Sequence, residues 1–153
     1  MSTQLDLTAI RRAVAGQIAA NVSKTIRCYA FRADAPVFPA AVVMPSPDRY
    51  VGYHQSFGLG ASDVALTVQL MVQRGDARSA DEQLDAFLSS GAGLTDSVVD
   101  AIGADRTLGG QVADTICTGA RMLSPVEWPT APGAPVIVVC VAELDLMVRV
   151  RRS

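Results

Sequence analysis

The chain has few cysteines, few aromatic residues and few charges. Aromatic residues make up 5% of its 153 residues and charged residues 18%, against a usual charged fraction of about 25%. The three cysteines, Cys28, Cys117 and Cys140, are odd in number and far apart, unlike the even, dense set of a disulfide scaffold. We therefore expect reduced thiols. The chain has 13 basic and 15 acidic residues. This balance argues against the clustered basic surface of a nucleic-acid groove.

Long apolar runs are also missing. The longest, Val136–Ala142, is far shorter than the ~20 residues that cross a bilayer. Residues 1–23 do not form a secretion signal, because Arg11 and Arg12 interrupt their apolar positions. We expect a soluble chain with no membrane partner, made in the cytoplasm. Since half of the residues are apolar and the length suits one domain, residues 1–153 should form a single domain with a substantial core.

The spacing of apolar residues predicts helices. Residues 7–22 carry apolar side chains three and four positions apart, and Asp6 or Thr8 can cap the start of this helix. Ser79 and Glu82 have the spacing of a capping box, in which each side chain satisfies the backbone N–H of the other residue. We expect a second helix to begin at this box.

A third, short helix is predicted over residues 94–102, with Thr95 as its cap and Leu94 facing inward. Trp128, the only tryptophan, falls in a loop that contains prolines. Alternating or continuous apolar residues predict strands over residues 25–31, 40–44, 63–73, 114–122 and 135–150. This order favours an α+β fold: a mixed or antiparallel sheet with an N-terminal helix and two further helices packed on one face.

The last predicted strand is too long for a compact domain. Val136–Val150, if unbroken, would measure about 50 Å at ~3.3 Å per residue, whereas the domain should be about 38 Å across. We expect this strand, or the long strand Val64–Val72, to reach a subunit boundary in a closed oligomer, with Leu144, Leu146 and Arg149 as candidate contact residues. The alternative is a bend or fraying after Asp145.

A glycine-rich segment, residues 48–62, holds four further candidate contact residues. These are Tyr50, Tyr53, His54 and Phe57. We interpret the segment as a strand end followed by a long loop. Aromatic residues in such a loop often form contact patches, although they can also pack over the edge of the sheet.

No catalytic, cofactor or metal site is predicted. His54 is the only histidine, and with three scattered cysteines it matches no zinc spacing. Residues 58–62 resemble a phosphate-binding loop only in glycine content, because they precede a strand and do not open a helix. Two pairs of carboxylates lie on predicted helices, with the members of each pair four positions apart: Asp81 with Asp85 and Asp96 with Asp100. We interpret both pairs as parts of solvated helix surfaces.

Residues 63–118 resemble a known family. The resemblance is carried, in order, by the alternating strand Val64–Val72, the Asp76-Ala77-Arg78 lead into a helix, Leu84–Leu88, Ala101-Ile102 and Asp105–Asp114 with its Thr-Leu-Gly-Gly-x-Val piece. Taken together these pieces resemble the tail terminator proteins of long-tailed, siphovirus-type bacteriophages, especially those of actinobacterial hosts.

The resemblance implies a structural virion protein without catalysis or cofactor. Members of this family form a homohexameric ring on the head-proximal end of the tail tube. The ring stops tube polymerisation and presents a surface to the head–tail connector. The implied partners are further copies of the chain, the major tail tube protein and the connector or stopper protein, and DNA passes through the lumen without specific binding. The implied location is the neck-proximal end of the tail, after assembly in the host cytoplasm.

Two alternatives remain open. One is another ring protein of the head–tail neck, such as a stopper or head-completion protein. The other is a small cytosolic enzyme or ligand-binding domain, which would have a concave pocket with convergent polar groups and a titratable residue of perturbed pKa.

Overall fold

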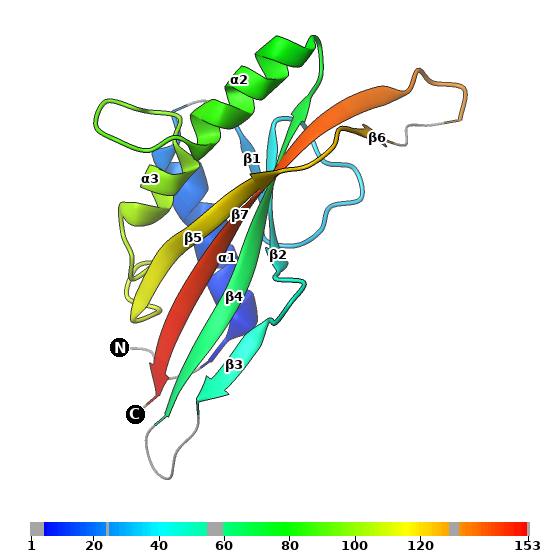
Figure 1. Ribbon diagram of the computed structural model, residues 1–153. Helices are drawn as coiled ribbons and strands as arrows, with labels where there is room; N and C mark the ends of the chain where they lie inside the picture. The colour runs from blue at the N-terminus through cyan, green and yellow to red at the C-terminus, as the bar shows by residue number, and fades with distance from the viewer. Residues whose placement is uncertain (1–4, 24, 55–59, 129–131, 153) are drawn as a thin grey trace.

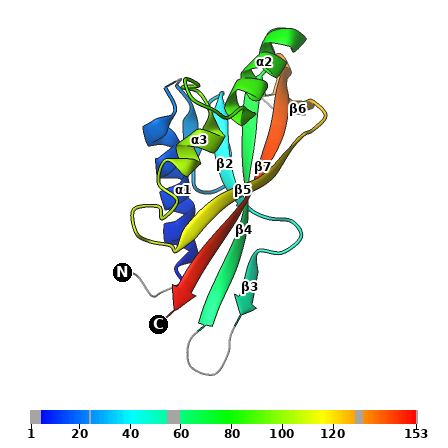
Figure 2. The same cartoon turned by 60° about the vertical axis from the view of Figure 1, so that its left-hand side comes forward.

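The computed structural model describes residues 5–23, 25–54, 60–128 and 132–152. Within these residues, three helices lie on one face of a seven-stranded sheet (Figures 1 and 2). The sheet is mixed, because β1 and β2 run parallel and the other neighbouring strands run antiparallel. The predicted α+β fold, with its N-terminal helix and two further helices on one face, is therefore confirmed.

Five strands form the main path of the sheet, in the order β1-β2-β4-β7-β5, while β3 pairs with β4 and β6 pairs with β7. The strands are β1 (Arg27–Tyr29), β2 (Ala40–Pro45), β3 (Val51–His54), β4 (Gly60–Gln73), β5 (Asp114–Met122), β6 (Val126–Trp128) and β7 (Ile137–Arg152). Part of the segment expected to be a loop is thus the strand β3, and Trp128 ends a short strand.

The first helix, α1 (Leu7–Asn21), begins where the sequence predicts. The carboxylate of Asp6 accepts a hydrogen bond from the backbone N–H of Ala9 at 3.1 Å, so Asp6 is its cap. Apolar side chains at the predicted spacing are buried against the sheet: Ile10, Val14 and Ile18. Helix α1 therefore covers the first half of the sheet, as its apolar stripe requires.

The second helix is α2 (Ala77–Leu88). It begins three residues earlier than predicted from the capping box of Ser79 and Glu82. Its cap is Asp76, whose carboxylate accepts hydrogen bonds from the Ser79 N–H at 2.9 Å and from the Ser79 hydroxyl at 2.8 Å. Glu82 instead pairs with Arg78 one turn away, at 2.8 Å. The predicted capping box is wrong, because the carboxylate of Asp76 can satisfy the helix start before Ser79 does.

The third helix, α3 (Val98–Gly103), is shorter than the predicted span of residues 94–102. Ser97 caps it by accepting the Asp100 N–H at 3.0 Å, whereas the carbonyl of Thr95 accepts a hydrogen bond from a loop residue that follows α1. Leu94 lies outside the helix and is exposed. The predictions for Thr95 and Leu94 are therefore wrong, since Ser97 is buried and can cap directly at the packed end of the helix.

The two longest strands, β4 and β7, form the centre of the sheet. They pair without interruption from Gly60 opposite Arg152 to Gln73 opposite Val139. The alternative of a bend or fraying after Asp145 is therefore wrong, because β4 pairs with every residue of β7 beyond that point. The paired strands extend past the helix layer at the end where β4 begins and β7 ends (Figure 1).

Most of the core lies between the helices and the sheet, and the opposite face carries a smaller apolar cluster. In that cluster the rings of Phe38 and Trp128 meet edge to face, with centroids 5.5 Å apart. The rest of this side has no helix over it (Figure 2), and we call it the open face. It consists of the side chains of β4, β7 and β5 that point away from the helices.

Candidate interaction surface

The structure separates the four aromatic and histidine candidates. Tyr50 is half-buried and packs against the main core. Tyr53 is 59% exposed on β3, at the end of the sheet beyond the helices. His54 is placed only as the last residue of β3, and Phe57 lies outside the described residues. Of the candidates whose side chains are described, Tyr53 is the exposed one.

The predictions for β7 need correction at two of three positions. Leu144 and Leu146 are 2% and 1% exposed, and both belong to the core beneath the helices. They cannot serve as contact residues, because alternate side chains of a strand point to opposite faces and these two point to the helix side. Arg149 has the other orientation and is exposed.

Arg149 lies in a row of charges that crosses the open face. Asp63 of β4 and Asp114 of β5 are both directly opposite it in the strand register. Its guanidinium donates to both carboxylate oxygens of Asp63, at 2.9 and 3.2 Å. Arg106 binds both oxygens of Asp114 at 2.7 and 2.6 Å, and these hydrogen bonds hold the pKa of Asp114 below its usual value. The row therefore alternates in sign from β4 to the loop before β5.

A second group of charges lies further along the same face. Arg121 of β5 donates to Glu143 at 3.0 Å and to Asp145 at 2.7 Å, and these partners raise the pKa of Arg121. Thr67 of β4 also donates to Asp145, at 3.2 Å. Each of these arginines already binds a carboxylate, so the open face offers little attraction for a phosphate backbone.

The outer edge of the sheet is apolar and has no strand beside it among the described residues. We define this outer edge as β5 and β6, which pair consecutively with β7. A bulge between Cys117 and Gly119 interrupts the pairing. Large apolar side chains are exposed on or next to this edge, at Ile116, Met122, Leu123, Val126 and Val136. An apolar edge of this kind associates with other chains unless something covers it.

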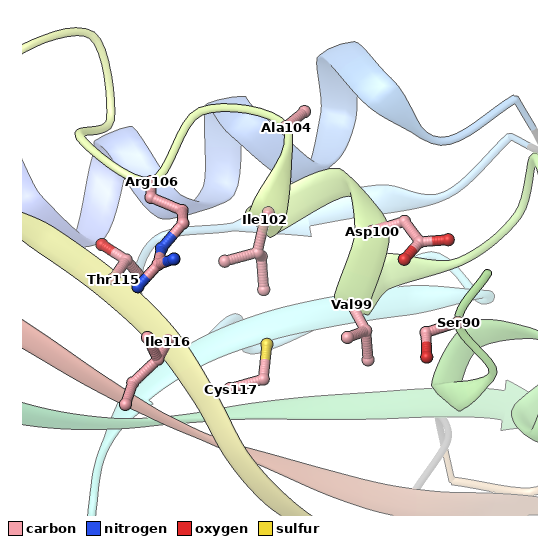
Figure 3. Close-up of a pocket in the computed structure, with 10 residues that line it drawn as sticks. Ser90, Val99, Asp100, Ile102, Ala104, Arg106, Thr115, Ile116 and Cys117 are labelled. Atoms are coloured by element: carbon pink, nitrogen blue, oxygen red, sulfur yellow. The ribbon is translucent and has the colours of Figure 1, made fainter. Parts of the chain in front are cut away.

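A hollow of about 470 Å³ lies between α3 and β5 (Figure 3), and we call it the α3–β5 hollow. Its middle is lined by the apolar side chains of Val99, Ile102 and Cys117. Polar side chains stand at its two ends, Arg106 with Thr115 at one and Asp100 with Ser90 at the other. The hollow is therefore shaped for a group with an apolar body and a polar tip.

Local hydrogen bonds fix the wall of the hollow that α3 provides. The buried hydroxyl of Ser97 donates to the carbonyl of Ser89, which ties the start of α3 to the end of α2. The carboxylate of Asp100 accepts the Gly91 N–H at 3.0 Å, and the side-chain amide of Gln17 in α1 donates to a carbonyl of α3 at 3.1 Å. These contacts to two other segments make the hollow a fixed feature of the fold.

Two polar groups in the hollow show what it can do chemically. Burial, with a smaller contribution from the charge of Asp100, raises the pKa of the Cys117 thiol to about 11, so the thiol is protonated at neutral pH and is not an activated nucleophile. Thr115 is 1% exposed, and its hydroxyl has no hydrogen-bond partner among the described residues. The hollow therefore holds no activated nucleophile, and the hydroxyl of Thr115 is closed off from solvent within the subunit.

Neither the hollow nor the outer edge was predicted from the sequence. A signal for the edge is present in residues 114–122, which include Ile116 and Met122 and only two charged residues, Asp114 and Arg121. The hollow has no such signal, because it arises from the way α3 packs beside β5.

Within the described ranges, no group of three or more His, Cys, Asp and Glu side chains could hold a metal ion. Among the same residues, no helix is long and apolar enough to cross a membrane. No protein-family model matches the chain, and no curated protein matches it.

Proposed function

We propose that this chain is a tail terminator of a long-tailed bacteriophage. In this role it forms a homohexameric ring on the head-proximal end of the tail tube, stops the addition of tube subunits and joins the tail to the head–tail connector. It acts by surface complementarity and catalyses no reaction. The proposal combines the resemblance of residues 63–118 with the surfaces described above.

The observation that carries the proposal is the outer edge with its exposed apolar side chains. It follows the unbroken 16-residue strand β7, which extends past the helix layer. A free monomer gains nothing from an uncovered apolar strand and risks aggregation through it. In a ring, a neighbouring copy covers such an edge. A head-to-tail contact gives a closed ring when a whole number of identical rotations between neighbouring copies completes a full turn.

The open face supports the same role. DNA must pass through a tail terminator without being held, so the channel wall should not carry a net positive charge. On the open face, Arg106, Arg121 and Arg149 are all bound by carboxylates. Such a surface meets the requirement for passage.

Electron microscopy of lysates from a phage lacking this protein tests the proposal. Abnormally long tails without heads are the expected result, because nothing stops tube growth. Tails of normal length would refute the assignment. If those normal tails also failed to join heads, the chain would instead be a stopper or head-completion protein.

A further inference from the structure

Each end of the main path of the sheet carries a strand edge that no described strand covers. Strand β1 ends the path on one side, and the outer edge ends it on the other. Exposed apolar side chains lie on or next to both edges: Phe31 and Val37 follow β1, and Met122, Leu123 and Val126 belong to the outer edge. Such edges present backbone N–H and carbonyl groups that pair with an added strand. The two edges are therefore candidate partners for one another in two copies of the chain.

The strand directions of the two edges agree. β1 is parallel to β2, whereas β2 is antiparallel to β4, β4 to β7 and β7 to β5, so β1 runs antiparallel to β5. A rotation about an axis along the strands keeps every strand direction. Such a rotation brings β1 of one copy beside β5 of the next as an antiparallel pair, whose hydrogen bonds run perpendicular to the strands.

The two edges also lie at the same level along the strands. Cys28 of β1 and Met122 of β5 are the ends of one row of opposite residues. The row crosses the strands between them at Ala41, Leu70 and Ala142. The next row joins Tyr29 to Arg121 in the same way. Since the rotation preserves level, the end of β5 in one copy meets β1 of the next.

At this level the backbone hydrogen-bonding groups point outward on both edges. Arg27 donates its N–H to the residue before β2, and the groups of successive residues in a strand point to opposite sides, so those of Cys28 point away from β2. Leu123 donates its N–H to the carbonyl of Val141 in β7, so the groups of Met122 point away from β7. Cys28 and Met122 therefore fit as a hydrogen-bonded pair, in which two residues exchange both N–H···O bonds.

Strand β3, another uncovered edge, does not fit the outer edge in this way. Gly52 of β3 shares a row with Asp114 of β5, so Tyr53 is level with Ala113. The carbonyl of Tyr50 accepts a hydrogen bond from β4, so the groups of Tyr53 point away from the sheet, whereas Ala113 donates its N–H inward to β7. These edges would pair only after a slip of one residue, which turns every side chain to the opposite face.

We infer that β5 of one copy of this chain pairs with β1 of a second copy, with Met122 and Cys28 as the central hydrogen-bonded pair. The contact is head-to-tail, because two different edges meet. Each copy therefore offers its outer edge to one neighbour and β1 to another. The inference rests on the proposed function only in that an identical copy covers the outer edge.

The inferred register places Arg27 of one copy directly opposite Leu123 of the next. Both residues are exposed. Both lie on the open-face side of the sheet, because Ala40 and Val141, which are opposite them within the subunit, belong to the smaller apolar cluster. As a non-hydrogen-bonded pair they would have Cα atoms about 4.5 Å apart, a separation that a disulfide can span.

Disulfide trapping with the purified chain tests this register. Under mild oxidation, Arg27→Cys combined with Leu123→Cys should give a ladder of linked chains that continues beyond the dimer. The matched control is Arg27→Cys combined with Val126→Cys, which places the second thiol further along the same edge and should give no ladder. Each single variant should also give none. Dimers alone would indicate a two-fold contact and overturn the inference, as would equal yields from the two double variants or no linked species up to the solubility limit.

Sedimentation velocity gives a second measurement. Met122→Lys keeps the backbone but places a charge in the contact, and it should weaken self-association roughly tenfold or more. Met122→Pro removes an N–H that faces solvent in the monomer, which an edge strand tolerates, and should weaken self-association roughly fivefold. The control is Leu94→Lys, because Leu94 is 47% exposed and Met122 is 46% exposed, but Leu94 lies outside both edges. Equal association of Met122→Lys and Leu94→Lys, or a wild-type chain that stays monomeric, would overturn the inference.

These outcomes are distinct from those of the lysate experiment. Long tails without this protein, together with no ladder, would support the terminator role and reject this contact. A ladder together with tails of normal length would support the contact in a ring of another function.

Discussion

Replacing Thr115 by valine tests whether its buried hydroxyl lacks a partner in the single subunit. The substitution exchanges the hydroxyl for a methyl group and keeps the branched shape that suits a strand. In the monomer, the new methyl group packs in the same position opposite Val148, which is fully buried. The backbone N–H of Thr115, which donates to Asp114 at 2.9 Å, is unchanged.

The expected effect is a gain in stability. A buried polar group without a partner costs about 1–3 kcal/mol, so Thr115→Val should raise the free energy of unfolding by up to that amount. For a chain of this length, each kcal/mol corresponds to roughly 2–4 °C in the melting temperature. The measurement is urea unfolding followed by circular dichroism, at a concentration low enough to keep the chain monomeric.

Thr67→Val is the matched control, because it should have the opposite sign. Thr67 is buried to the same extent as Thr115, at 1% exposed, but its hydroxyl donates to Asp145 at 3.2 Å. Removing that hydrogen bond should lower stability by about 1 kcal/mol or somewhat more. If Thr115→Val destabilised the monomer as Thr67→Val does, the hydroxyl of Thr115 would have a partner within the subunit, and the reasoning would be refuted.

Three further predictions follow from burial and pKa. Leu146→Ala should lower the free energy of unfolding by about 2–5 kcal/mol, because Leu146 is in the core. Met147→Ala, on the open face, should lower it much less. Chemical denaturation measures both values, and equal losses would contradict the assigned faces. Asp76→Ala should lower the melting temperature at neutral pH, because the hydrogen bonds of the cap hold the pKa of Asp76 below its usual 3.8. That difference from the wild type is present above pH 3.8 and should shrink as the pH falls through the lower folded-state pKa, so a constant difference would contradict the cap. Cys117 should be alkylated at pH 8 more slowly than an exposed thiol, because its pKa is about 11; mass spectrometry can measure the rate, and a rate equal to that of an exposed thiol would contradict its burial.

The strands could be predicted because their signals are local. Residues 114–122 form β5 over the predicted span, and the strand of residues 63–73 was found because its apolar residues alternate. The pairing of β7 with β4 confirms that the last strand is long and unbroken, whereas its contact with another subunit stays a prediction. Helix starts were harder to predict, because more than one polar residue near each start can accept the free N–H groups. Asp76 and Ser97 act as caps where the sequence pointed to Ser79 and Thr95.

The candidate surface could be predicted only in part, because it depends on contacts between distant segments. Tyr53 was identified from composition, but its level relative to β5 follows from the pairing of four strands. Leu144 and Leu146 were placed on the wrong side because a strand pattern shows that residues share a face without showing which face the helices cover. The hollow requires α3 beside β5, which no pattern within either segment indicates.

Adding the purified chain to growing tail tubes of the phage that we propose encodes it tests the central claim most directly. If the chain acts by fitting its edges to identical copies and to a tube end, electron micrographs should show a ring at one end of each tube and no growth beyond it. Tubes that lengthen at the same rate with and without the chain, and carry no ring, would contradict the claim.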